Sequence, residues 1–66
     1  MIAKLELYRI FNAVSRNKSF SNAAKELYMT QPAVSQSISK LEKELETLLF
    51  NRTPKGVTLT NEGELL

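Results

Sequence analysis

The chain has 66 residues, of which 42% are hydrophobic and 24% charged, and its formal net charge is +2. A chain of this length forms one domain, and such a small domain buries only about 60% of its unfolded surface. Cysteine and histidine are both absent, which excludes disulfides, thiolate nucleophiles and the commonest zinc ligands. All seven acidic residues are glutamates, so the composition disfavours an enzyme and predicts no cofactor or metal site.

No apolar run exceeds three residues, as in Leu48-Leu49-Phe50. A membrane-spanning helix needs about 20 consecutive apolar residues, and nothing near Met1 resembles a secretory signal. We therefore expect no membrane partner and a cytoplasmic location.

The charges are unevenly distributed along the chain. No acidic residue occurs between Leu27 and Leu41 or between Phe50 and Asn61, whereas residues 42–49 contain three glutamates. Acid-free surfaces can approach a polyanion without repulsion. From composition alone, an ordinary solvated surface is the simpler interpretation.

Helical periodicity predicts a first helix from about Lys4 to Arg16. Its expected apolar positions are Leu5, Tyr8, Phe11 and Val14, with Leu7 and Ile10 beside them. The polar residues 17–19 end this helix.

A short second helix follows and ends near Tyr28. Phe20, Ala23, Ala24 and Leu27 have the i, i+3, i+4, i+7 spacing of one helix face. Ser21 is a plausible N-cap for it, or Ser19 if the helix begins earlier.

The third helix, over about residues 31–47, has the strongest pattern. Thr30 is its candidate N-cap, and Pro32 lies in the first turn, where its missing N–H costs nothing. Its apolar stripe comprises Val34, Ile38, Leu41, Leu45 and Leu48. The opposite face comprises Pro32, Gln36, Ser39, Lys40 and Lys43, flanked by Ser35.

After this helix, two short β-prone segments at 50–53 and 57–60 flank Pro54-Lys55-Gly56, which predicts a β-hairpin with a three-residue connection. Thr60 or Asn61 then caps a new helix, and Asn61-x-x-Glu64 fits a capping box. The fold class is therefore mainly α with a small β-hairpin: a winged helix-turn-helix. We assign residues 1–60 to this domain, 20–39 to the helix-turn-helix, 50–60 to the wing and 61–66 to the start of a truncated linker helix.

The joint between the second and third helices is the most specific part, because Ala23 and Ala24 allow two helices to pack closely. Any αα-corner needs similar packing, but an outward helix face without acids before Glu42 favours DNA contact. The sequence also resembles the amino-terminal domain of LysR-type transcriptional regulators over nearly the whole chain. The matching motifs are Phe11 with Ala13-Val14, Ser19-Phe20-x2-Ala23-Ala24-x2-Leu27, Gln31-Pro32-Ala33-Val34-Ser35-x2-Ile38-x2-Leu41-Glu42-x2-Leu45, Leu49-Phe50-x-Arg52-Thr53 and Leu59-Thr60-x2-Gly63.

The resemblance implies sequence-specific binding of double-stranded DNA, with the third helix in the major groove and the wing on the adjacent backbone or minor groove. It implies that base edges are contacted by Gln31, Pro32, Ser35 and Gln36. It implies phosphate contacts from Ser21, Thr30, Lys40, Arg52, Thr53 and Lys55. Hydroxyls and cations suit phosphates, whereas amide side chains can distinguish bases. Solvent exposure explains Lys43 and Ser37 about as well as DNA contact does.

Two residues depart from the family pattern. Many members have arginine where this chain has Gln36; since glutamine pairs with adenine and arginine with guanine, we expect adenine at that position of the half-site. Glu46 stands where the family usually has glycine. Either the helix continues through Leu48, or Glu46 adopts a strained left-handed conformation, which is the prediction made here.

The resemblance further implies a bacterial homodimer on an imperfectly palindromic operator, joined through a long helix that starts near Asn61, and a larger domain beyond it that binds a small effector. An alternative is a helical protein-interaction module using the Val34–Leu48 stripe, although this stripe spans barely two heptads. An enzyme using Glu42, Glu44 or Glu46 is the weakest alternative, because these residues have no partnering base.

Overall fold

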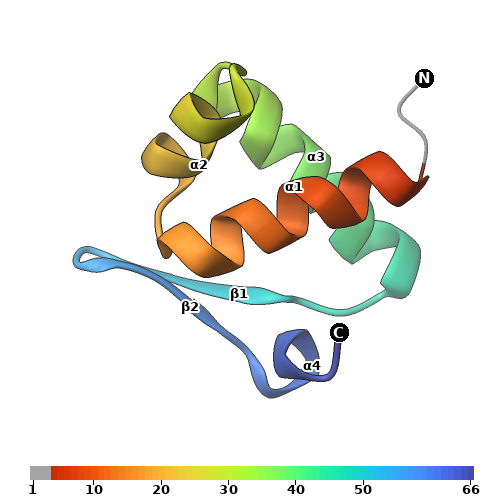
Figure 1. Cartoon of the computed structure of the whole chain (residues 1–66). Helices are drawn as coiled ribbons and strands as arrows, with labels where there is room; N and C mark the ends of the chain where they lie inside the picture. Colours follow the sequence, from red (N-terminus) through yellow and green to blue (C-terminus); the bar gives the residue numbers. More distant parts are fainter. Residues whose placement is uncertain (1–3) are drawn as a thin grey trace.

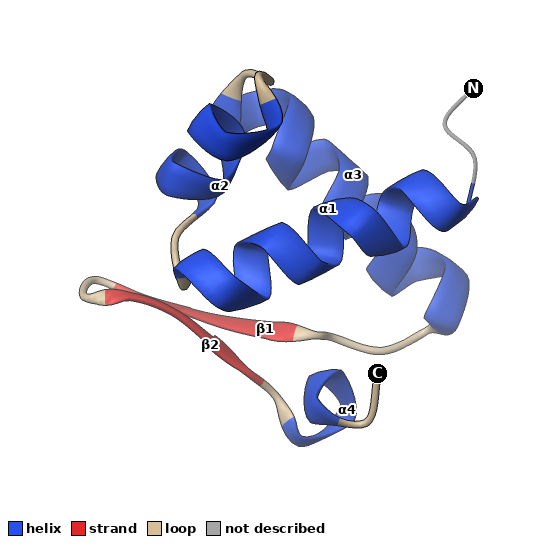
Figure 2. Ribbon diagram, in the orientation of Figure 1, coloured by secondary structure: helices blue, strands red, loops and turns tan. Residues whose placement is uncertain are grey.

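The computed structural model describes residues 4–66. In chain order the elements are α1 (Lys4–Asn17), α2 (Phe20–Leu27), α3 (Gln31–Leu45), β1 (Phe50–Thr53), β2 (Gly56–Leu59) and α4 (Asn61–Glu64). The first three helices pack on one another, and the antiparallel β1–β2 hairpin lies along α1 with α4 beside β2 (Figures 1 and 2). The predicted fold class is therefore confirmed.

The buried face of α1 comprises Leu7, Ile10, Phe11 and Val14, together with Ala13. The prediction that Leu5 belongs to this face is wrong, because its side chain is 82% exposed. Leu5 precedes Leu7 by two residues, which is about 200° around a helix. Its side chain therefore points away from the core.

The short helix α2 is capped by Ser19, whose Oγ accepts a hydrogen bond from the Asn22 N–H at 3.1 Å. The alternative cap, Ser21, is wrong because Phe20 already belongs to the helix and Ser21 lies in its first turn. At the other end, Tyr28 takes a left-handed conformation (φ 55°). Its N–H and that of Met29 then satisfy the carbonyls of Lys25 and Ala24.

Helix α3 begins as predicted, with the Thr30 side chain accepting from the Ala33 N–H at 3.2 Å. It ends at Leu45, two residues before the predicted end. Glu46 is left-handed (φ 54°), and the N–H groups of Glu46 and Thr47 donate to the carbonyls of Lys43 and Glu42. The predicted left-handed conformation of Glu46 is thus confirmed, and the longer helix is wrong.

Because the helix ends there, Leu48 does not continue the apolar stripe. Its side chain is 65% exposed, whereas Val34, Ile38 and Leu41 are fully buried and Leu45 is half-buried. The left-handed residue redirects the backbone, so that Leu49 enters the core in place of Leu48.

The chain between α3 and β1 is held by side chains from both sides. The Glu42 carboxylate accepts hydrogen bonds from the Leu49 and Phe50 N–H groups at 2.8 and 3.3 Å. From the other side, the Thr60 hydroxyl donates to the Leu48 carbonyl at 2.6 Å and the Thr60 N–H donates to the Leu49 carbonyl at 3.0 Å. A Cβ at Gly63 would collide with the Leu49 carbonyl oxygen, so this close approach requires glycine.

The hairpin pairs Phe50 with Leu59 and Thr53 with Gly56, which leaves a two-residue turn at Pro54-Lys55. The predicted three-residue connection is wrong because Gly56, at φ 138°, joins the strand instead of the turn. Strand β2 accordingly starts one residue before the predicted segment and ends at Leu59. Thr60 is the N-cap of α4 and accepts from the Gly63 N–H, so a cap at Asn61 is wrong.

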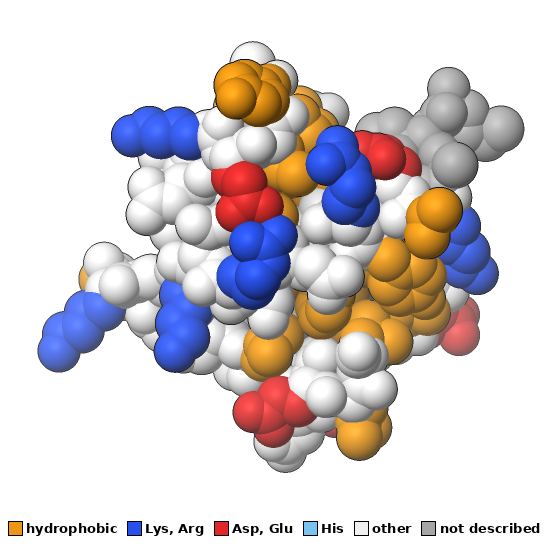
Figure 3. Space-filling model, in the orientation of Figure 1, with side chains coloured by type: hydrophobic (Ala, Val, Ile, Leu, Met, Phe, Trp, Pro, Cys, Tyr) orange, Lys and Arg blue, Asp and Glu red, His pale blue; other side chains and the backbone are white. Residues whose placement is uncertain are grey.

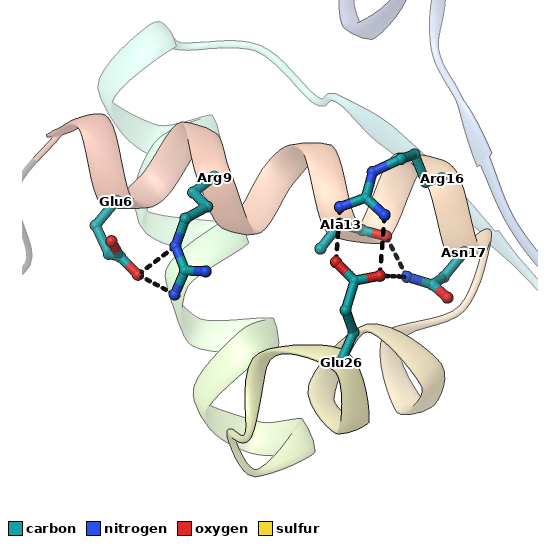
Figure 4. Close-up of polar contacts among 6 residues, drawn as sticks. All are labelled: Glu6, Arg9, Ala13, Arg16, Asn17 and Glu26. Atoms are coloured by element: carbon teal, nitrogen blue, oxygen red, sulfur yellow. Dashed lines mark hydrogen bonds and ion pairs between the residues drawn. The ribbon is translucent and has the colours of Figure 1, made fainter.

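Charged side chains of both signs lie close together over α1 and α2 (Figure 3). Arg16 in α1 forms a two-pronged pair with Glu26 in α2, with N–O distances of 2.9 and 2.6 Å (Figure 4). The Asn17 amide donates to the same carboxylate at 3.0 Å and to the Ala13 carbonyl at 2.7 Å. The hydrogen bonds from Arg16 and then Asn17 lower the pKa of Glu26. This exposed network ties the end of α1 to α2.

We expect Glu46→Gly to stabilise the domain. Glycine adopts the left-handed conformation without the steric cost that a Cβ imposes there, about 1 kcal/mol, which corresponds to a rise in Tm of about 4–8 °C for a domain of this size. Thermal unfolding followed by circular dichroism measures it. Glu46→Ala is the matched control, since it removes the same carboxylate but keeps the Cβ; an equal rise for both variants would contradict the strain.

We expect the Glu26 network to stabilise the fold only while its carboxylate is ionised. Its pKa is lowered in the folded state from the ordinary 4.5, so its contribution is fully present above that value and is lost as the pH falls through the lower, folded one. Glu26→Gln should therefore lower Tm at pH 7 and reduce the loss of Tm between about pH 5 and about pH 3. Glu44→Gln is the matched control, since it removes an exposed carboxylate that forms no ion pair within residues 4–66. An equal loss of Tm between about pH 5 and about pH 3 in Glu26→Gln and in the wild type would refute this role.

Candidate nucleic-acid interface

The outward face of α3 presents polar side chains to solvent. Of the residues predicted to contact bases, Gln31, Pro32 and Gln36 are exposed, whereas Ser35 is half-buried. The cations Lys40 and Lys43 are exposed on the same helix. Ser37 is only 4% exposed, so its side chain belongs to the core and not to this face.

A shallow pocket of about 220 Å³ adjoins this face. Met29 from the α2–α3 turn and Ala33 supply its apolar lining, and Gln36, Ser37 and Lys40 complete it. An amide and an ammonium group therefore stand next to an apolar hollow large enough for a methyl group.

No carboxylate in residues 4–66 forms an ion pair with a cation of α3 or of the hairpin. In residues 4–66 one ion pair joins Arg9 to Glu6 within α1, and the other joins Arg16 of α1 to Glu26 of α2 (Figure 4). The cations of α3 and the hairpin have no carboxylate within ion-pair distance in that part of the chain: Lys40, Lys43, Arg52 and Lys55. Lys55 lies in the hairpin turn, which projects from the helices at the left of Figure 1. Lys4, Lys18 and Lys25 are also exposed and form no ion pair within residues 4–66, so the unpaired positive charge of α3 and the hairpin is only part of the total. It is the part that lies on stretches of sequence without an acidic residue, 28–41 and 50–61.

The three predicted hydroxyl contacts differ in what they can donate. The Thr30 oxygen accepts the capping hydrogen bond from Ala33, which leaves its O–H proton free. Ser21 is exposed in the first turn of α2. The Thr53 hydroxyl instead donates to the Gly56 carbonyl at 2.9 Å and braces the hairpin turn, so a phosphate would have to displace this bond to receive its proton.

Arg52 lies where the hairpin meets α2. Its guanidinium carbon stands 4.5 Å from the centroid of the Phe20 ring, which is a cation–π contact. Sequence reasoning missed this partner, because the two residues are far apart in the chain and only the hairpin's position brings them together. No spacing or composition signal could have found it.

The glutamates considered for catalysis do not form a site. Glu42 is occupied by two backbone N–H groups, and Glu44 and Glu46 are exposed. Among residues 4–66 no three acidic side chains lie close enough together to hold a metal ion. Within the same residues no helix has the length and apolarity to span a membrane.

Known proteins resemble this chain in both sequence and structure. Residues 5–64 match the family described as "Bacterial regulatory helix-turn-helix protein, lysR family". An HTH-type transcriptional regulator of Methanocaldococcus jannaschii is 49% identical over 65 residues, which are 98% of this chain and 22% of that protein. The HTH-type transcriptional activator AmpR of Pseudomonas aeruginosa is 48% identical over 62 residues, 94% of this chain and 21% of that protein. The chain thus spans about a fifth of the length of these relatives.

Two similar crystal structures are DNA complexes. That of the CbnR DBD with DNA has a TM-score of 0.91 at 28% identity, covering 96% of this chain and 72% of that one. That of the BenM DBD with catB site 1 DNA has a TM-score of 0.91 at 38% identity, covering 96% and 71%. With the family match extending from α1 into α4, the chain belongs to the lysR family of bacterial regulatory helix-turn-helix proteins.

Proposed function

We propose that this domain binds double-stranded DNA sequence-specifically, with α3 in the major groove and the hairpin on the adjacent backbone or minor groove. The observation that carries the proposal is the distribution of charge: the cations Lys40, Arg52 and Lys55 are unpaired within residues 4–66 and lie on stretches without an acidic residue, 28–41 and 50–61. An α-helix fits the width of the major groove, and unpaired cations attract phosphates. The DNA complexes of the CbnR and BenM domains support the same function.

In this proposal, residues in the first half of α3 contact base edges, three of them with polar side chains and Pro32 with an apolar ring: Gln31, Pro32, Ser35 and Gln36. Hydroxyls and cations around them contact phosphates: Ser21, Thr30, Lys40, Arg52, Thr53 and Lys55. The apolar hollow beside Gln36 suits a thymine methyl group, and glutamine itself suits adenine. Both features favour an A·T pair opposite this part of α3.

The whole protein, in the same proposal, acts in the cytoplasm as a homodimer on an imperfectly palindromic operator. One helix covers only a few base pairs, so specificity needs two half-sites separated by one or more turns of DNA. Residues 1–60 form the DNA-binding domain, and 61–66, which include α4, begin a longer linker helix. A separate domain that binds a small effector would follow it, and the DNA-binding domain itself needs no cofactor.

The alternative interaction module has little surface available to it. Val34, Ile38 and Leu41 are fully buried in the domain's own core, so three of the five stripe residues cannot contact a partner helix. A coiled-coil seam through α3 would require the domain to unfold.

Binding of the 66-residue chain to a non-specific 20-base-pair duplex should weaken steeply as salt rises. About four to six phosphate contacts predict a slope of log K against log [salt] of about −4 to −5. Fluorescence anisotropy across a salt series measures it. Lys40→Ala should reduce the slope by about 1, whereas Lys4→Ala, at the start of α1, should leave it unchanged. A flat response, or no binding at low salt, would exclude this function.

Gln36→Arg should change the preferred base from adenine to guanine at one position in each half-site, because arginine donates to guanine O6 and N7. Selection of bound duplexes from a random pool with the full-length regulator, wild type and variant in parallel, gives the two preferences. Lys40→Arg is the control, since it alters a proposed phosphate contact and should leave the selected bases as they are. An unchanged base preference for Gln36→Arg would show that Gln36 does not contact that base.

A further inference from the structure

We propose that Phe20 is a positioning residue for DNA binding, which acts by holding the guanidinium of Arg52 in a fixed orientation toward the DNA backbone. The inference rests on the proposed function and adds to it a residue that touches no DNA. It also distinguishes Arg52 from the other unpaired cations, whose side chains have no such support among the contacts of residues 4–66.

The Phe20 ring is itself rigidly held. It is 8% exposed and begins α2, and its edge packs on Phe50 of β1 at a centroid distance of 6.1 Å and an interplanar angle of 70°. Phe50 in turn packs on Phe11 of α1 at 5.3 Å. The surface over which the Arg52 guanidinium lies is therefore fixed by three elements of the core.

Arg16 and Arg52 have partners of different chemistry, and the partner decides whether the guanidinium keeps its net charge and free N–H donors. Arg16 is held by a carboxylate, which cancels its charge and occupies its N–H donors. Arg52 is held by an aromatic ring at 4.5 Å, which restrains the guanidinium without neutralising it and leaves its N–H donors unused. A restrained but uncompensated guanidinium loses less entropy when it binds a phosphate in a two-pronged arrangement.

Beside the contact between Arg52 and Phe20, a backbone hydrogen bond also connects the hairpin to the helix-turn-helix. The Val57 N–H, opposite Arg52 in the hairpin, donates to the Lys18 carbonyl at 3.2 Å, just before α2 begins. The half of the hairpin nearest its turn is thereby fixed to the chain just before α2, where Arg52 lies, whereas Lys55 belongs to the turn itself. We infer that Arg52 and the start of α2 approach the DNA as one rigid surface.

A double-mutant cycle tests the inference: Phe20→Leu, Arg52→Ala and both together, with binding of the 66-residue chain to the 20-base-pair duplex measured at low salt. Phe20→Leu keeps the apolar packing but removes the ring. We expect it to weaken binding about threefold to fivefold when Arg52 is present and to have no effect in the Arg52→Ala background. The salt slope should not change with Phe20→Leu, since no charge is removed.

Phe11→Leu is the matched control. It removes another ring from the same cluster, next to Phe50 but without contact to Arg52, so it should lower Tm yet weaken DNA binding by the folded protein clearly less than Phe20→Leu does. Circular dichroism at the assay temperature verifies that every variant is folded. Additive effects of Phe20→Leu and Arg52→Ala, or an equal loss of affinity with Phe11→Leu, would overturn the inference.

A second measurement separates this inference from the proposed function. In the DNA-free protein, a ring 4.5 Å from the guanidinium carbon should shift the NMR signals of the Arg52 side-chain protons upfield, and Phe20→Leu should abolish the shift. Failure of the wild-type chain to bind DNA would refute the proposed function. Absence of the upfield shift would refute the positioning of Arg52 whether or not DNA binds.

Discussion

The reversal of the chain after α3 is the constraint on which the rest of the structure depends. The helix ends on a left-handed Glu46, and one turn earlier the Glu42 carboxylate receives the N–H groups of Leu49 and Phe50. Charged acceptors make the stronger hydrogen bonds in proteins, and without Glu42 these two half-enclosed N–H groups would lose their side-chain acceptor. This one side chain therefore determines where the hairpin starts relative to the helix that faces outward.

The aromatic cluster depends on that reversal. Only when Phe50 is returned toward the helices does its ring meet Phe11 and Phe20, and only then does Arg52 reach the outer face of Phe20. Thr60 and Gly63 approach the same segment from the side of α4. The segment 48–50 thus joins α3, the hairpin and α4, which ties the proposed DNA-contacting surface to the start of the helix that leads out of the domain.

Much of the fold and part of the candidate site could be predicted from sequence. Periodicity located the three helices, and local chemistry identified the capping residue Thr30. The motif from Ala23 to Leu45 indicated the family, and the glycine that the family usually has at position 46 led to the prediction of a left-handed Glu46. Two of the errors share a cause: Leu5 and Leu48 satisfy an apolar period but point away from the core. A local sequence pattern shows which residues share one face of a helix. Whether that face is buried depends on which other element of the structure packs against it. The proposed DNA contacts of the site residues stay predictions.

The sequence by itself determined the helix-turn-helix, the absence of acids before Glu42 on the outward face of α3, and the family. These follow from contacts within a few residues or from motifs of fixed spacing. Only the tertiary structure decided that Glu42 holds the hairpin, that Ser37 is buried while Gln36 is exposed, and that Arg52 stacks on Phe20. The contacts of Glu42 and Arg52 depend on the direction in which the chain leaves α3, whereas the burial of Ser37 depends on how α3 packs on α1 and α2. The left-handed backbone conformation of one residue, Glu46, sets the direction in which the chain leaves α3. No local sequence pattern encodes which distant side chains are brought together as a result.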